Sequence, residues 1–134
     1  MTNHEFAGSY FRQARSIYCE LLEHYEKQEW NLVVRRAQES VELILKGFLR
    51  EAGIEVPRIH DVGNILKKEQ KKISSKLVKE LPRIISLSRR LRQERETSFY
   101  GDEEQDLPPS TLYTQIDADE AKKDVEWLMK FISI

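Results

Sequence analysis

Apolar side chains recur at intervals of three and four residues through most of this chain, and this spacing constrains the fold more than any other feature. The longest example is the stretch 30–52, whose repeating residues are Val33, Val34, Ala37, Val41, Ile44, Leu45, Phe48 and Leu49. This interval gathers side chains on one face of an α-helix, whereas a half-buried strand would alternate. No convincing alternating run of strand length occurs. The sequence therefore predicts an all-α fold.

The same spacing predicts two long helices, over about 6–28 and 30–52, joined by a very short turn that makes them pack antiparallel. Gly53 should end the second, because glycine tolerates the left-handed conformation of a helix C-terminal cap. A short helix is expected around 61–68. Pro82 suits the first turn of a further helix, after a turn capped by Ser74 or Ser75.

Beyond Phe99 the helical pattern fails, and residues 100–110 are expected to form an ordered surface loop. A final helix is predicted to start near Asp117, because Asp117 and Glu120 have the spacing of a capping box. Together these elements predict an antiparallel bundle of four to five helices. The chain has 134 residues, which is the length of one ordinary domain, so residues 1–134 are expected to be a single helical domain.

Composition excludes several classes of protein. The apolar runs are much shorter than the roughly 20 residues that span a membrane, so no membrane association is expected. The first residues after Met1 lack a basic and then apolar signal segment, and the lone Cys19 cannot form an internal disulfide. A cytoplasmic setting is therefore expected. No pair of histidines has helix spacing and the acidic residues after Gly101 lack the pattern of a calcium-binding loop, so no metal or cofactor is predicted.

The net charge of −1 conceals a division along the chain. Residues 58–95 carry 12 basic and 4 acidic side chains, a net charge of +8, whereas residues 96–134 carry 3 basic and 10 acidic ones, a net charge of −7. A basic block can bind phosphates, since Lys and Arg displace counterions from them. It can equally be a solvated face that balances the acidic segment within the fold or across an oligomer.

Three arginines within the block, Arg89, Arg92 and Arg95, recur at intervals of three and should lie along one side of a helix. Arginine is well shaped for bidentate contact with phosphate. The same side chains could instead pair with the acidic segment, notably with Glu103, Glu104 and Asp106, and the sequence does not decide between the two.

Other candidate residues also have two interpretations. Tyr100 and Asp102 flank a glycine beside the arginine helix and could contact a ligand, or Tyr100 could plug the end of the bundle. His60 precedes an aspartate with the character of an N-cap, which favours a structural histidine. Glu42 and Lys46 are four residues apart, in the orientation that favours an ion pair on a helix.

Four groups of residues, taken in order, resemble prokaryotic members of the HEPN family (higher eukaryotes and prokaryotes nucleotide-binding). They are an opening helix with Phe6, Tyr10, Ala14 and Arg15; Trp30 followed by Ala37, Gln38, Glu39, Glu42 and Lys46; Gly53, Pro57, His60, Asp61, Val62 and Leu66; and Arg95, Phe99, Tyr100, Gly101, Asp102, Pro108, Tyr113 and Ala118.

The resemblance implies a helical bundle, commonly a homodimer, with a cleft around the fourth helix. It also implies a nucleotidyltransferase partner in a toxin–antitoxin pair. Active members resemble metal-independent endoribonucleases that use an arginine, four to six intervening residues and a histidine, which can exchange a proton near neutral pH. Surplus aromatic residues, namely Tyr10, Phe11 and Trp30, could help to form a dimer interface.

This chain departs from the nuclease pattern. The three positions allowed for the histidine after Arg95 hold Tyr100, Gly101 and Asp102. Every histidine of the chain precedes the arginine cluster that begins at Arg89. The predicted function is therefore a nucleotide-binding or RNA-binding interaction module, more readily a binding protein than an enzyme. Its predicted binding residues are Arg89, Arg92, Arg95, Tyr100 and Asp102. The alternative is an endoribonuclease with a degenerate motif, in which Arg95 holds phosphate and Tyr100 or His60 transfers the proton.

Overall fold

The computed structural model describes residues 2–55 and 62–133. Four long helices form the bundle: α1 (Asn3–Glu26), α2 (Trp30–Glu51), α5 (Leu81–Tyr100) and α7 (Gln115–Met129). Shorter elements complete the described part of the chain: α3 (Val62–Lys68), the 3₁₀ turn η1 (Gln70–Lys72), α4 (Ser75–Lys79) and α6 (Pro109–Leu112). The described residues contain no β-strand, which confirms the predicted all-α fold.

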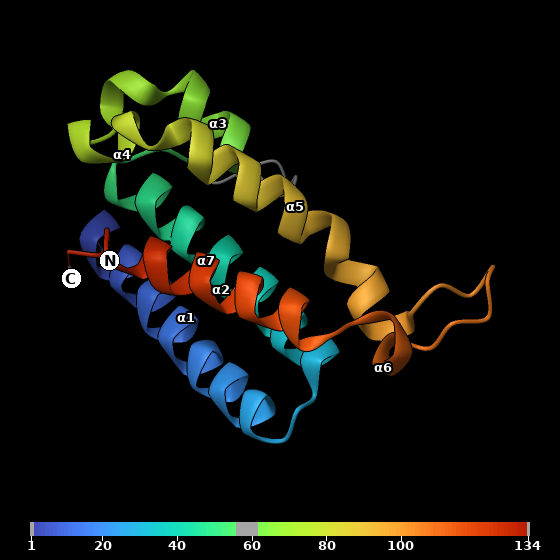
Figure 1. The fold of residues 1–134 in the computed structure, drawn as a ribbon. Coiled ribbons are helices and arrows are strands. Elements are labelled where there is room, and N and C mark those ends of the chain that lie inside the picture. Colours follow the sequence, from blue (N-terminus) through green and yellow to red (C-terminus); the bar gives the residue numbers. More distant parts are fainter. Residues whose placement is uncertain (1, 56–61, 134) are drawn as a thin grey trace.

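The helix α2 lies at the centre of the bundle, in contact with α1, α5 and α7 (Figure 1). Its apolar stripe is the one predicted from the sequence, and all eight of its residues are buried. Gly47 lies against the buried Phe11 of α1, because a Cβ atom on this glycine would be 2.3 Å from the Phe11 ring. The rings of Phe11 and Phe48 pack 5.7 Å apart at the same contact. The spacing of apolar residues thus decides which side chains form the core, and the lack of a side chain at Gly47 leaves room for Phe11 between α1 and α2.

The ends of the first two helices follow local chemistry. The Thr2 side chain accepts a hydrogen bond from the Glu5 N–H group, and the Glu5 carboxylate accepts one from the Thr2 N–H group in return. The backbone of Gly53 has a φ angle of +75°, so glycine ends α2 as predicted.

Three expectations require correction or fall outside the described residues. The final helix begins at Gln115 rather than near Asp117, because Thr114 is its N-cap and donates its N–H group to the Asp117 carboxylate at 2.9 Å. Phe11 is fully buried within one chain, so it cannot contribute to a dimer interface. His60 lies outside the described residues.

No helix within the described ranges is both long enough and apolar enough to cross a membrane. Cys19 lies on α1 and is exposed.

Candidate phosphate-binding groove

The three arginines predicted to share one side of a helix all lie on α5, but the structure divides them between two grooves. Arg92 and Arg95 line a groove between α2, α3 and α5, which we call the arginine groove. Its lining residues are Gln38, Val41, Glu42, Val62, Ser88, Leu91, Arg92 and Arg95. Arg89 instead lines a second groove, next to α3 and α4. The three predicted arginines therefore fall into two separate grooves.

The wall that α2 contributes to the arginine groove is polar and ordered. The Gln38 amide nitrogen donates a hydrogen bond to the Glu42 carboxylate at 3.3 Å, and Glu42 also pairs with Lys46 at 3.5 Å, as predicted. Gln38 is only 4% exposed, and its amide oxygen has no hydrogen-bond partner in the described part of the chain. A buried acceptor without a partner costs roughly 1–3 kcal/mol of stability.

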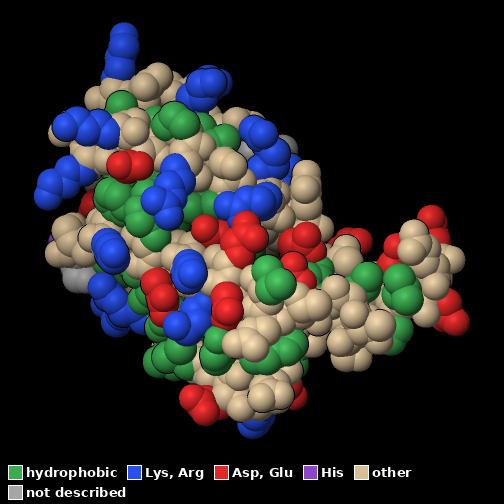
Figure 2. Space-filling view, in the orientation of Figure 1, with side chains coloured by type: hydrophobic (Ala, Val, Ile, Leu, Met, Phe, Trp, Pro, Cys, Tyr) green, Lys and Arg blue, Asp and Glu red, His purple; other side chains and the backbone are tan. Residues whose placement is uncertain are grey.

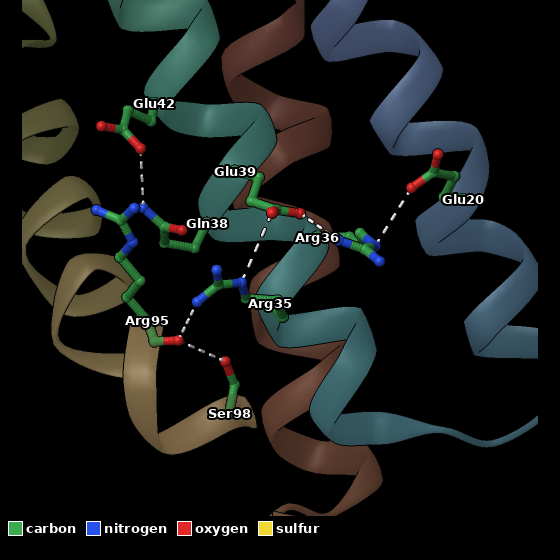
Figure 3. A network of polar contacts seen from close by, with 8 residues as sticks. All are labelled: Glu20, Arg35, Arg36, Gln38, Glu39, Glu42, Arg95 and Ser98. Carbon is green, nitrogen blue, oxygen red and sulfur yellow. Dashed lines mark hydrogen bonds and ion pairs between the residues drawn. The ribbon is translucent and has the colours of Figure 1, made fainter. Parts of the chain in front are cut away.

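Arg95 extends its guanidinium group toward Gln38 and Glu42 (Figure 3). Its side chain is exposed, and no ion pair joins it to a carboxylate within residues 2–55 and 62–133. Arg95 is therefore an arginine without an ion pair in the described ranges. It lines the groove together with Arg92, and its guanidinium group is directed toward the Gln38 amide and the Glu42 carboxylate. Arginine in this setting can form two parallel hydrogen bonds to one phosphate.

A chain of arginines and glutamates fixes the backbone below Arg95 (Figure 3). The Arg35 guanidinium group donates a hydrogen bond to the Arg95 carbonyl oxygen and pairs with Glu39 at 3.6 Å. Arg36 pairs with the same Glu39 at 2.7 Å and with Glu20 of α1 at 3.3 Å. This hydrogen bond and these ion pairs thus connect the backbone of Arg95 on α5 to α1 through α2.

The sequence left open whether Arg89, Arg92 and Arg95 pair with Glu103, Glu104 and Asp106, and no ion pair between described residues joins these two groups. Within the acidic segment 96–134, two carboxylates of α7 pair with Arg90 instead. The Arg90 guanidinium group contacts Glu120 at 2.5 Å and Asp124 at 3.1 Å. The reason is geometric, since Arg90 is on the side of α5 that faces α7. Burial raises the pKa of the Asp124 carboxyl group above its usual 3.8, and the charge of Arg90 opposes that rise.

Tyr100 and Asp102 do not line the arginine groove. Tyr100 lies five residues after Arg95, which is about 140° around the helix, and it is 64% exposed. The Asp102 carboxylate accepts a hydrogen bond from the Gln105 N–H group at 3.1 Å and so holds the next turn together.

Sequence reasoning missed Arg35 and Ser88 as parts of this region. Arg35 lies off the apolar stripe of α2, directly after Val34, and nothing in the sequence indicated its contact with α5. No group of three His, Cys, Asp or Glu side chains in the described ranges could hold a metal ion.

A family model described as "HEPN domain" matches residues 7–134. No curated protein and no solved structure matches the chain.

Proposed function

The chain belongs to the HEPN domain family, and we propose that its arginine groove binds the phosphates of a nucleotide or of RNA. Membership gives the chain a nucleotide-related or RNA-related function. The finer proposal is that the protein is a binding and interaction module. Its partner would be a minimal nucleotidyltransferase in a toxin–antitoxin pair.

One observation carries the assignment to this groove. Arg92 and Arg95 line it together, and Arg95 has no carboxylate partner in the described ranges. A phosphate could thus bind Arg95 without breaking an existing ion pair of that side chain.

The groove also supports binding over cleavage. An endoribonuclease that used Arg95 and Tyr100 would need both side chains at one phosphodiester bond, within hydrogen-bond reach of the atoms that react. Tyr100 is not among the residues that line the groove, and the phenol of tyrosine ordinarily has a pKa near 10, too high for a base at neutral pH.

The test uses a labelled single-stranded RNA, a chelator and the purified protein without a partner. Fluorescence anisotropy compares the parent with Arg95→Ala and with Arg12→Ala, a control that removes the same charge from an exposed position on α1. We expect Arg95→Ala to bind about tenfold more weakly, because charge-assisted hydrogen bonds to phosphate contribute about 1.5–3 kcal/mol. The slope of affinity against salt should fall by about one phosphate contact in this variant alone.

Two results would contradict the proposal. Equal binding by the parent and Arg95→Ala would remove the groove as the site. Cleavage of the RNA that disappears in Arg95→Ala would show that the protein is a ribonuclease. The nucleotidyltransferase partner is tested separately, by purifying the chain together with any nucleotidyltransferase encoded beside it and measuring whether the two proteins co-elute.

A further inference from the structure

The second groove on the surface of the bundle lies between α3, α4 and the first half of α5, and we call it the basic groove. It has a volume of about 360 Å³, which lies within the range of known binding pockets. Its floor is aliphatic, since Leu81 is buried and Val78 and Ile85 are half-buried. The chain therefore has a concave apolar surface that the proposed phosphate binding does not use.

The rim of the basic groove is cationic. Lys67 of α3 and Arg89 of α5 line it, both are exposed, and neither forms an ion pair in the described part of the chain. Residues 62–89 carry eight basic and two acidic side chains, a net charge of +6. Figure 2 shows Lys and Arg side chains around this end of the molecule, with hydrophobic side chains between them. An occupant that fits both surfaces must therefore combine anionic groups with apolar ones.

The lining of the basic groove favours a protein over RNA as this occupant. Bases of single-stranded RNA commonly stack on aromatic side chains, and none of the eight lining residues is aromatic. Leu81, Ile85 and Arg89 follow one another at intervals of four residues, so the aliphatic floor passes into the cationic rim along one row of α5. A hydrophobic groove of this kind can receive the apolar face of an amphipathic helix.

We propose that the basic groove binds an acidic amphipathic helix of a partner protein. Aliphatic side chains at intervals of three and four residues in that helix would cover the floor, and carboxylates beside them would pair with Lys67 and Arg89. The row from Leu81 to Arg89 covers about 12 Å of α5, so about two to three turns of the partner would fill it. Such a helix could bind while phosphate occupies the arginine groove, because the two grooves have no lining residue in common.

The probe is a synthetic peptide of about 18 residues, long enough to be partly helical, with leucine on one face and glutamate on the others. Fluorescence anisotropy of the labelled peptide compares the parent with Lys67→Glu/Arg89→Glu. We expect the double variant to bind at least about tenfold more weakly, because like charges then face each other. A peptide with lysine in place of every glutamate should bind the double variant better than the parent. A peptide with serine in place of the leucines should bind neither protein.

Arg12→Glu/Lys123→Glu is the matched control, since it makes the same change of charge at exposed positions on α1 and α7. It should bind the acidic peptide as tightly as the parent does. Circular dichroism should show the parent helix content in both double variants, so that a loss of binding reports the groove rather than unfolding.

A second measurement locates the bound peptide. Cys19 is the only cysteine of the chain, so a Cys19→Ser background allows one fluorophore to be attached at a chosen position. A solvent-sensitive fluorophore on Ser86→Cys, which lines the basic groove, should shift its emission to shorter wavelength when the acidic peptide binds. The same fluorophore on Gln13→Cys, at an exposed position on α1, should not respond.

Four results would overturn the proposal. They are a parent without saturable binding of the acidic peptide, equal binding by Lys67→Glu/Arg89→Glu, and a fluorophore at position 86 that does not respond. The fourth is displacement of the peptide from Arg95→Ala by single-stranded RNA, which would show that the basic groove takes nucleic acid instead. Arg95→Ala should lose RNA affinity and keep its affinity for the peptide, so the two grooves are tested independently.

Discussion

Arg35 on α2 donates a hydrogen bond from its guanidinium group to the main-chain carbonyl oxygen of Arg95 on α5. The same guanidinium lies over the Phe99 ring, with its central carbon 4.4 Å from the ring centroid. One arginine thus holds the backbone of another, whose own side chain enters the groove. In the proposed function, Arg35 positions the backbone and Arg95 contacts the phosphate.

Replacing Arg35 with methionine should therefore act on both stability and binding. We expect the free energy of unfolding to fall by about 1–3 kcal/mol, since the hydrogen bond and the cation–π contact are lost together. RNA affinity should also fall, although Arg35 does not line the groove. Urea denaturation and anisotropy measure the two effects, with Arg12→Met as the control. A fully stable Arg35→Met variant would show that this contact contributes nothing.

Gly47→Ala should destabilise the protein. Alanine favours a helix over glycine by about 1 kcal/mol, but the new methyl group would collide with the buried ring of Phe11. We expect a net loss of about 1–3 kcal/mol, as is usual for overpacking a core. Phe11→Leu, which shortens that side chain, should make the second substitution less costly. The cycle of single and double variants, measured by denaturation, would contradict this explanation if the two effects were additive.

Gly101→Ala should act locally. The conformation of this residue, φ +73° and ψ −158°, is nearly exclusive to glycine, so alanine should cost about 1–3 kcal/mol. The backbone hydrogen bonds between Asp102 and Leu107, which close residues 101–108 as a small hairpin, should be lost while the bundle keeps its helix content. Limited proteolysis should cut the variant within residues 101–108 faster than it cuts the parent. Equal cleavage of both proteins would contradict the prediction.

Asp124 and Glu126, two residues apart on α7, should show opposite dependence of stability on pH. Burial raises the pKa of Asp124, despite Arg90, so the folded state binds its proton more tightly than the unfolded state. Its stabilising contribution is thus present at low pH and is lost as pH rises through the raised pKa. Asp124→Asn should therefore gain stability relative to the parent as pH rises above about 3.8.

Glu126 has the reverse sign. Burial alone would raise its pKa, but hydrogen bonds from Tyr18 and Lys122 outweigh burial and lower it below the usual 4.5. Its contribution is present above that value and is lost as pH falls through the lowered pKa. Glu126→Gln should therefore lose stability relative to the parent as pH rises. Denaturation of both variants from acid to neutral pH tests the pair, and trends of the same sign would contradict it.

The sequence predicted the helices well, because burial in a bundle repeats every three to four residues and the stripe of α2 follows that repeat without exception. Gly53 and Pro82 marked helix ends through their own backbone chemistry. The start of α7 was misplaced because Asp117 has the chemistry of both an N-cap and the third residue of a capping box. In the structure Asp117 is the third residue of the box, because its carboxylate accepts a hydrogen bond from the N–H group of the N-cap residue Thr114.

The candidate site was less predictable. A step of three residues turns a helix by about 300°, so Arg89, Arg92 and Arg95 drift around α5. Which helices flank each arginine decides the groove it enters, and this depends on packing between residues far apart in sequence. Arg35 was missed for the same reason, since its acceptor is 60 residues away.

Only residues 27–29 separate α1 from α2, whereas Tyr18 meets Glu126 across 108 positions of sequence. Contacts between neighbouring segments form faster than contacts that must close a long loop. We therefore expect the α1–α2 hairpin to be the folding nucleus and α7 to dock last. On the ribosome, the hairpin can form while α5 is still within the exit tunnel. The arginine groove, which needs α5 as one wall, would then form only late in synthesis.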